Sequence, residues 1–197
     1  MRIISIGDLV TDFYYKNDKL VGVSGGMTSH NIIANIAKLG LETAAYSVCG
    51  DDMAGTIAIN SLKKVGTNID NVKRLEDINT RCFHISYKEL NGKLEFTSKK
   101  RCPFCNIKRW YEESKIEPND ILHQINKDDV LVFDNLNNKN QIIIDNCANT
   151  KMLDLGQYFE LENYENNEIL KKIKNKFDII NLNERVEKYL KNRFFTL

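Results

Sequence analysis

The sequence predicts an α/β domain in which a mainly parallel sheet is flanked by helices and carries a small β lid. Short apolar runs alternate with amphipathic stretches along most of the chain, as strands and helices do in a parallel sheet. Near residues 80–100, apolar and polar residues instead alternate one by one, which indicates a two-sided β element. A length of 197 residues without an internal repeat or a clear linker favours a single domain over residues 1–197.

The first strand and the first helix flank a polar segment. Residues 2–6 are an apolar run that ends just before Asp8, and we expect a buried strand there. A helix is expected from about Thr28 to Leu39, because apolar residues recur at helical spacing and Gly40 follows as a terminating residue.

A second strand and helix follow, and then the β lid. The strand is expected over 43–48, and the helix after it ends near Gly66. Residues 80–87 alternate in polarity, and Asn91-Gly92 lies between two β-like runs, which is a strong hairpin signal. We expect the lid elements near residues 10–25 and 80–100, projecting from the main sheet.

The strand and helix alternation resumes in the second half of the chain. We expect strands over 129–133, 151–155 and 177–181, and helices over 139–147, 168–176 and 184–195.

Charge and apolar run length exclude several functional classes. Lys plus Arg is 28 and Asp plus Glu is 27, so the net charge of +1 leaves no electrostatic footprint for a nucleic acid or an anionic membrane. No apolar run is long enough for a membrane span, and the N-terminus reads as a strand rather than a signal peptide. The five cysteines are odd in number and scattered, which favours reduced thiols and a cytoplasmic location.

Four residues near the first strand and helix are candidates for ligand binding. Asp12 follows the first strand, and the carboxyl ends of strands face the ligand crevice in open α/β sheets. A carboxylate there accepts hydrogen bonds from two adjacent hydroxyls, as in a polyol or ribose; the alternative is an Asp that caps a turn. Gly25 and Gly26 precede a helix and either let a ligand approach the backbone or form a tight turn. Asn31 either reaches ligand hydroxyls or is a solvated helix residue.

A second candidate site is the Cys-Pro-Phe-Cys sequence that contains Cys102 and Cys105. Two thiolates at this spacing are half of a zinc site, which needs four ligands. Cys82 and His84, or a second subunit, are the possible sources of the others. Reduced structural thiols and a redox dithiol are the alternatives, the redox one less favoured because a basic stretch in a loop precedes Cys102.

Four motifs occur in a fixed order along the first third of the chain. They are Gly7-Asp8 with Asp12; Gly25-Gly26 with Asn31; the run from Ala34 to Gly40; and Gly50 to Gly55 with Leu62 to Gly66. Together they resemble the amino-terminal half of the ribokinase-like (PfkB) carbohydrate kinases. The resemblance implies a Rossmann-like ribokinase fold with a β lid over the sugar. It also implies transfer of the γ-phosphate of ATP, with Mg²⁺, to a hydroxyl of a small-molecule sugar or nucleoside.

The resemblance gives roles to the candidate residues. Asp12, Gly26 and Asn31 would bind sugar hydroxyls. One more residue than usual separates the glycines from Asn31, so either Gly26 takes the first-glycine part, which makes the Gly25 assignment doubtful, or the helix entry is altered.

The resemblance continues, less sharply, to a segment near residues 178–184 that is similar to the strand leading to the family's phosphate and magnesium site. The family motif there is Asn-x-x-Glu, and Val186 stands at the expected Glu. Asn183 is retained, and Glu184 or Glu187 is the expected substitute.

The family's carboxyl-terminal signature, a Gly-Ala-Gly-Asp-like anion hole with the catalytic base, has no counterpart in this sequence. Because phosphoryl transfer depends on positioning and charge neutralisation, we expect a truncated kinase that lacks the nucleotide-binding part and is inactive unless another chain completes it. One alternative is a non-catalytic sugar-binding or regulatory module that associates through its lid, for example as a homodimer. Another is an interaction protein centred on Cys102 and Cys105.

Overall fold

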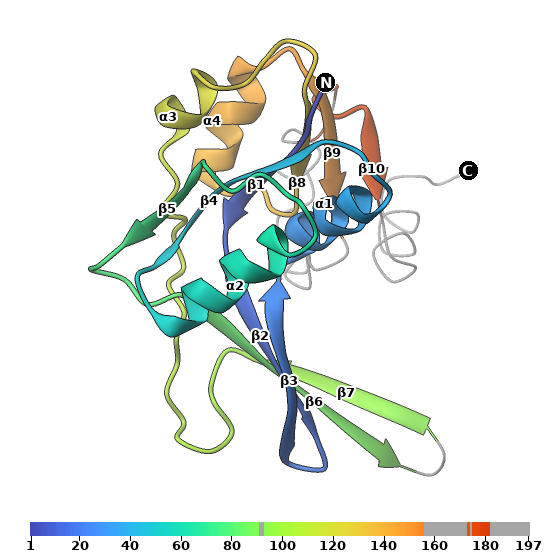
Figure 1. The fold of residues 1–197 in the computed structure, drawn as a ribbon, viewed down its shortest axis with the longest axis vertical. Coiled ribbons are helices and arrows are strands. Elements are labelled where there is room, and N and C mark those ends of the chain that lie inside the picture. The colour runs from blue at the N-terminus through green and yellow to red at the C-terminus, as the bar shows by residue number, and fades with distance from the viewer. Residues whose placement is uncertain (91–92, 156–172, 174, 182–197) are drawn as a thin grey trace, which may run out of the picture.

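The computed structural model describes residues 1–90, 93–155, 173 and 175–181, and its main sheet has six strands in the order β10-β9-β8-β1-β4-β5 (Figure 1). These strands are β1 (Ile3–Asp8), β4 (Thr43–Gly50), β5 (Val72–Leu75), β8 (Val130–Phe133), β9 (Thr150–Asp154) and β10 (Ile179–Asn181). Every neighbouring pair in this sheet is parallel. The predicted parallel sheet is confirmed.

Helices cover both faces of the main sheet. They are α1 (Thr28–Lys38), α2 (Met53–Lys63), α3 (Pro118–Leu122) and α4 (Asn138–Asn146). On one face, Ile33 of α1 and Ala58 of α2 belong to the same buried cluster as Ala45 of β4. On the other face, Ile143 of α4 belongs to the cluster that contains Phe133 of β8. A sheet buried on both faces explains why its strands read as continuous apolar runs.

The first two helices end where the sequence predicts. Gly40 and Gly66 have φ values of +84° and +87°, which lie in the left-handed region that glycine adopts without strain. Gly40 N–H donates to the carbonyl of Ala37, and Gly66 N–H donates to that of Lys63. These bonds satisfy carbonyls left open at the helix ends.

The β lid is a second sheet in the order β3-β2-β6-β7, and it projects from the main sheet at the bottom of Figure 1. Its strands are β2 (Val10–Lys16), β3 (Lys19–Gly26), β6 (Arg81–Leu90) and β7 (Lys93–Lys99). β2 pairs antiparallel with β3 and parallel with β6, and β6 pairs antiparallel with β7. The chain therefore makes a lid from two hairpins that are distant in sequence.

Some predicted elements fall outside the described residues. These are the helices expected over 168–176 and 184–195, apart from residues 173, 175 and 176, and the Asn91-Gly92 turn itself. Leu90 pairs with Lys93 across that turn, as the hairpin prediction requires. Among the helices that the structure describes, none has the length and apolar character needed to cross a membrane.

Candidate functional site

Asp12 is a buried carboxylate at the root of the β lid, on β2 directly after the first strand of the main sheet. Its relative exposure is 6%. The Tyr14 hydroxyl donates to Asp12 Oδ2 at 3.3 Å, whereas Asp12 Oδ1 is buried without a hydrogen-bond partner among the described residues. Burial raises the pKa of Asp12 to about 6, and the hydrogen bond from Tyr14 opposes this rise. Because an unpartnered buried oxygen is costly, this atom is suited to accept a hydrogen bond from a ligand.

Gly26 lies directly against the Asp12 carboxylate. A Cβ placed on Gly26 would fall 2.3 Å from Asp12 Oδ2 and 2.4 Å from Oδ1, so a side chain here would displace the carboxylate. Gly25 faces the other way: its Cβ would lie 3.0 Å from Ser61 Cβ, and its N–H donates to Ser61 Oγ at 2.8 Å. Gly26 thus lies against the Asp12 carboxylate, whereas Gly25 packs against α2.

Asn31 is exposed on α1 and lines a groove of about 350 Å³ between α1, α2 and β3. Gly25, Gly26 and Ser61 line the same groove, whereas Asp12 does not. Gly26 therefore borders both the groove and the Asp12 carboxylate. The structure shows no direct contact between Asn31 and Asp12.

The entry to α1 is strained at Met27. This residue has φ +75° and ψ 141°, a backbone conformation that non-glycine residues rarely adopt, and no side chain caps the helix there. The strain falls between Gly26 and Asn31, where the sequence has its extra residue.

Three carboxylates lie at the carboxyl ends of adjacent strands of the main sheet. Asp8 ends β1, Asp134 follows β8, and Asp154 ends β9. Asp134 Oδ2 accepts hydrogen bonds from both the N–H and the hydroxyl of Ser29, at 3.0 and 2.8 Å, and so fixes the first turn of α1. Sequence reasoning missed Asp134 and Asp154, although each closes a short apolar run in the way that Asp8 does.

Asp8 is also tied to the lid through Arg81, the first residue of β6. Arg81 Nη1 lies 3.4 Å from Asp8 Oδ2, and both side chains are buried. The guanidinium lies over the rings of Trp110 and Tyr111, at 4.9 and 4.2 Å from their centroids, and the Tyr111 hydroxyl donates to Asp8 Oδ1 at 3.3 Å. This cluster joins the root of the lid to the carboxyl edge of the sheet.

Of the remaining predicted site residues, the structure describes the two cysteines but not the three residues expected near phosphate and magnesium. Asn183, Glu184 and Glu187 lie outside the described residues. Cys102 and Cys105 lie on a turn after β7, and nowhere in the described part of the chain do three or more His, Cys, Asp or Glu side chains form a group able to hold a metal ion. Cys82 and His84 therefore do not complete a zinc site with the cysteine pair in this chain.

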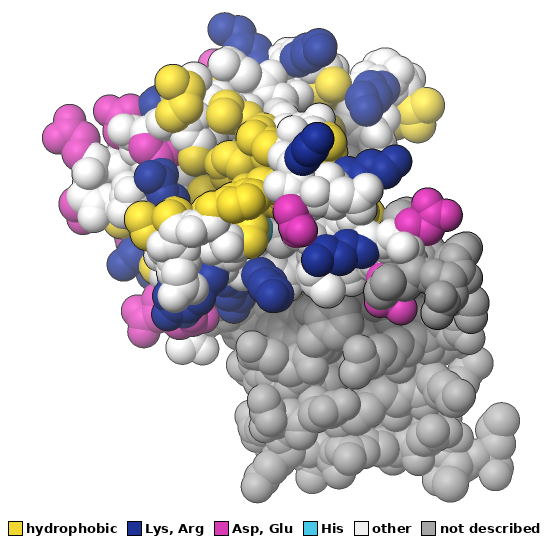
Figure 2. Space-filling model, turned by 90° about the horizontal axis from the view of Figure 1, so that it is seen from below, with side chains coloured by type: hydrophobic (Ala, Val, Ile, Leu, Met, Phe, Trp, Pro, Cys, Tyr) yellow, Lys and Arg dark blue, Asp and Glu magenta, His cyan; other side chains and the backbone are white. Residues whose placement is uncertain are grey.

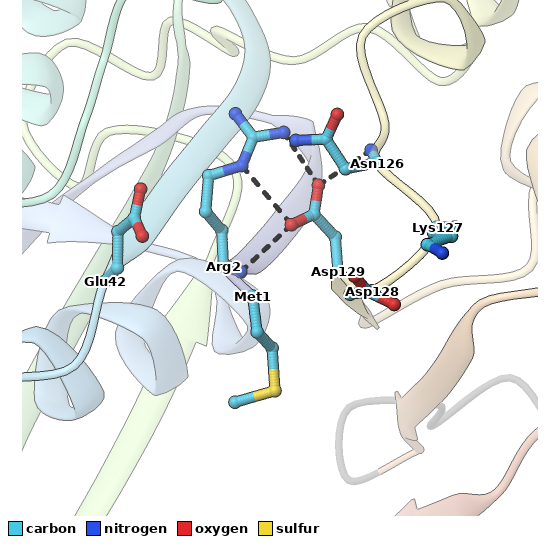
Figure 3. A pocket seen from close by; sticks show the side chains of 7 residues that line it. All are labelled: Met1, Arg2, Glu42, Asn126, Lys127, Asp128 and Asp129. Carbon is cyan, nitrogen blue, oxygen red and sulfur yellow. Dashed lines mark hydrogen bonds and ion pairs between the residues drawn. The ribbon is translucent and has the colours of Figure 1, made fainter.

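A second cavity, of about 420 Å³, lies at the opposite, amino-terminal edge of the sheet (Figure 3). Its main feature is an ion pair at 2.7 Å between Arg2 Nη2 and Asp129 Oδ2, and Asp129 also accepts the backbone N–H groups of Arg2 and Asn126. These bonds fasten β1 to the turn before β8. Ligands of open α/β sheets bind at the carboxyl ends of the strands, so we interpret this cavity as structural.

The fold agrees with the comparison to known families. Residues 2–152 match the profile of the pfkB family carbohydrate kinases. The chain belongs to the pfkB family. Its main sheet with flanking helices and a β lid is the ribokinase-like fold that the sequence predicts.

The chain is also similar to individual kinases. Over 66 residues the chain is 38% identical to the guanosine-inosine kinase of Exiguobacterium acetylicum, an alignment that covers 32% of this chain and 22% of that protein. The structure of an uncharacterized sugar kinase from Pyrococcus horikoshii matches this chain with a TM-score of 0.74 and 19% sequence identity, and the alignment covers 98% of this chain and 66% of that kinase. The same kinase has also been solved in complex with ATP. The fructokinase of Xylella fastidiosa matches with a TM-score of 0.71 and 16% sequence identity, and the alignment covers 97% of this chain and 64% of the fructokinase. The chain thus spans about two thirds of the length of these solved kinases.

Proposed function

We propose that this chain binds the acceptor for an ATP-dependent kinase that transfers the γ-phosphate of ATP to a hydroxyl of a sugar or nucleoside. The observation that carries the proposal is the Asp12 carboxylate, which is buried at the root of the lid with Oδ1 unpartnered among the described residues. Family membership supports the reaction class.

The chemistry of Asp12 fits a polyhydroxylated acceptor. A carboxylate has two oxygens and accepts from two neighbouring hydroxyls, and hydrogen bonds to a charged group are stronger than neutral ones. Gly26 leaves the space beside the carboxylate free of a side chain. Asn31 offers an amide on the adjoining groove. A closed lid would exclude water from the bound acceptor.

ATP and Mg²⁺ enter the proposal through the family alone. The residues expected near phosphate and magnesium, Asn183, Glu184 and Glu187, lie outside the described residues, and the described part contains no metal-holding cluster. We assign no step of phosphoryl transfer to a described side chain. Because the sequence has no Gly-Ala-Gly-Asp-like signature, we expect acceptor binding with little turnover by this polypeptide alone.

A thermal-shift titration with a panel of sugars and nucleosides, with and without MgATP, tests the proposal. Ligand at 100 times its Kd stabilises a protein by about 2.7 kcal/mol, which is readily measured. We expect at least one acceptor to stabilise the protein and Asp12→Asn to remove that stabilisation. Asp18→Asn is the matched control, since Asp18 is an exposed carboxylate on the same hairpin. Equal acceptor binding by the wild type and Asp12→Asn would contradict the proposal.

A second candidate function is a non-catalytic, cytoplasmic sugar-binding module that associates with another copy through its lid. The lid carries exposed apolar side chains, with Val21 62% and Phe96 68% exposed. Figure 2 shows hydrophobic side chains gathered on the face seen from below, with lysine and arginine side chains around them. Light scattering on the wild type and Phe96→Ser tests the association: a wild type that is monomeric at high concentration rejects it. Acceptor binding without phosphorylation, even with other chains added, distinguishes this module from the kinase.

A further inference from the structure

Cys102 and Cys105 lie together on one closed turn. Cys102 N–H donates to the carbonyl of Ile107, and Asn106 N–H donates to that of Cys102, both at 3.0 Å. Residues 101 and 108 pair across the base of the turn, and Asn106 takes φ +56° to reverse the chain. The backbone thus holds the two cysteines, three positions apart in sequence, on the same closed turn.

The five free cysteines of the chain differ sharply in their surroundings. Cys49 and Cys82 are buried, and burial raises the pKa of each to about 11. Burial also raises the pKa of Cys147. At Cys102, burial acts in the same direction, but hydrogen bonds from the backbone N–H groups of Cys105 and Phe104 and from the Cys105 thiol outweigh it and lower the pKa below its usual value. The thiolate is the reactive form, and the lowered pKa gives Cys102 the largest thiolate fraction of these four at neutral pH.

The turn is accessible from solvent. Cys105 is exposed, Cys102 is half-buried, and the intervening Phe104 is 64% exposed. One edge of the turn contacts the lid, where the Phe104 ring lies 5.4 Å from that of Tyr15. An external disulfide therefore has access to Cys102, while the lid supports the turn from behind.

We propose that Cys102 and Cys105 form a redox-active dithiol that exchanges with external disulfides. The Cys102 thiolate attacks one sulfur of a disulfide RSSR, which forms a mixed disulfide and releases RS⁻. Cys105 gives its proton to solvent and attacks the Cys102 sulfur, which forms the Cys102–Cys105 bond and releases the second RS⁻. The protein loses two electrons, and RSSR is reduced to two thiols.

Peptide mapping after exposure to glutathione disulfide tests this proposal on the intact protein. Trypsin cleaves after Arg101 and Lys108, so one peptide, Cys-Pro-Phe-Cys-Asn-Ile-Lys, separates this pair from the other three cysteines. We expect this peptide to become lighter by two hydrogen atoms and to resist alkylation until a reductant is added. The other three cysteines are expected to alkylate, once the protein is denatured, as in untreated protein.

Single variants assign the two roles. In Cys105→Ser we expect a stable glutathione adduct on Cys102, because no resolving thiol remains. In Cys102→Ser we expect adduct formation to be severalfold slower, because the attacking thiol has been removed. Cys147→Ser, which changes a half-buried cysteine elsewhere, is the control and should match the wild type.

Three results would overturn the proposal. In the first, both cysteines of the pair alkylate fully after exposure to the disulfide. In the second, the adduct accumulates on Cys105 rather than Cys102. In the third, purified protein holds stoichiometric zinc that protects both thiols, which would make the pair a metal site completed by a second copy. None of these readouts depends on acceptor binding or phosphoryl transfer.

Discussion

The Cα of Gly26 lies so close to the carboxylate of Asp12 that a Cβ on Gly26 would fall 2.3 Å from Asp12 Oδ2. This distance is much shorter than a non-bonded contact allows, so any side chain at position 26 would force the carboxylate out of its position. The neighbouring Gly25 is crowded by α2 instead. Two adjacent glycines therefore serve two purposes, one in the candidate site and one in helix packing, and substitutions can separate them.

Gly26→Ala is expected to displace the Asp12 carboxylate and weaken acceptor binding by about tenfold or more, with a loss of stability of about 1–2 kcal/mol. Gly22→Ala, on the same strand, is the control, because its Cβ would lie 3.8 Å from the nearest atom of Tyr14. Gly25→Ala should reduce stability through its contact with Ser61 and leave the affinity of the folded protein nearly unchanged. Calorimetric titration and urea unfolding measure both effects. Equal losses of affinity in Gly25→Ala and Gly26→Ala would contradict the division of roles.

The pKa of Asp12 makes stability depend on pH. Burial raises the folded pKa to about 6, above the ordinary value of 3.8, so the folded state binds the proton more tightly than the unfolded state does. The contribution of Asp12 to stability is therefore full below the unfolded pKa and is lost as pH rises through about 6, a change of roughly 2–3 kcal/mol. In the absence of acceptor, Asp12→Asn should be more stable than the wild type above this pH. Urea unfolding between pH 4 and pH 8 measures the difference, and parallel pH curves for the two proteins would be inconsistent with it.

The Arg2 and Asp129 pair at the far edge of the sheet has the opposite dependence. Burial acts to raise the pKa of Asp129, but hydrogen bonds from Arg2 and Asn126 outweigh it and lower the folded value. The stabilisation of the folded state by ionised Asp129 is therefore present above the unfolded pKa of this carboxyl group and is lost as pH falls through its folded pKa. Near pH 7, Asp129→Ala should cost about 3 kcal/mol, because it removes the acceptor of the Arg2 guanidinium and of the backbone N–H groups of Arg2 and Asn126. Asp128→Ala, at the exposed neighbouring position, is the control, and chemical denaturation of both variants checks the result.

Met27 offers a test of backbone strain at the start of α1. Met27→Gly and Met27→Ala both remove the side chain, but only glycine adopts φ +75° without strain. We expect the glycine variant to be more stable than the alanine variant by about 1 kcal/mol, the reverse of their usual order in and near helices. Thermal unfolding of the two proteins is the measurement. A more stable alanine variant would show that the helix entry relaxes to an ordinary conformation.

Local patterns in the sequence predict the elements and part of the site. Apolar periodicity predicts α1 and five of the six strands of the main sheet, and glycine marks the ends of α1 and α2, because these features depend on neighbouring residues and on backbone preferences. The edge strand β5 is not predicted, because its sequence Val-Lys-Arg-Leu has no apolar run. Asp12 and Gly26 are identified as candidates for the same reason, since each stands at a junction between elements. Their functional role is still a proposal that the experiments above test.

Only the tertiary structure decides how residues from distant segments meet. Asp134 holds the start of α1 through Ser29, although 105 positions separate the two residues. Arg81 reaches Asp8 because the strand order places the lid beside the end of β1. Gly25 and Gly26 are identical in sequence terms, and the packing of α2 against β3 gives them different neighbours. Local sequence determines backbone conformation and apolar periodicity, whereas long-range packing determines which polar atoms are buried and which are left without a partner.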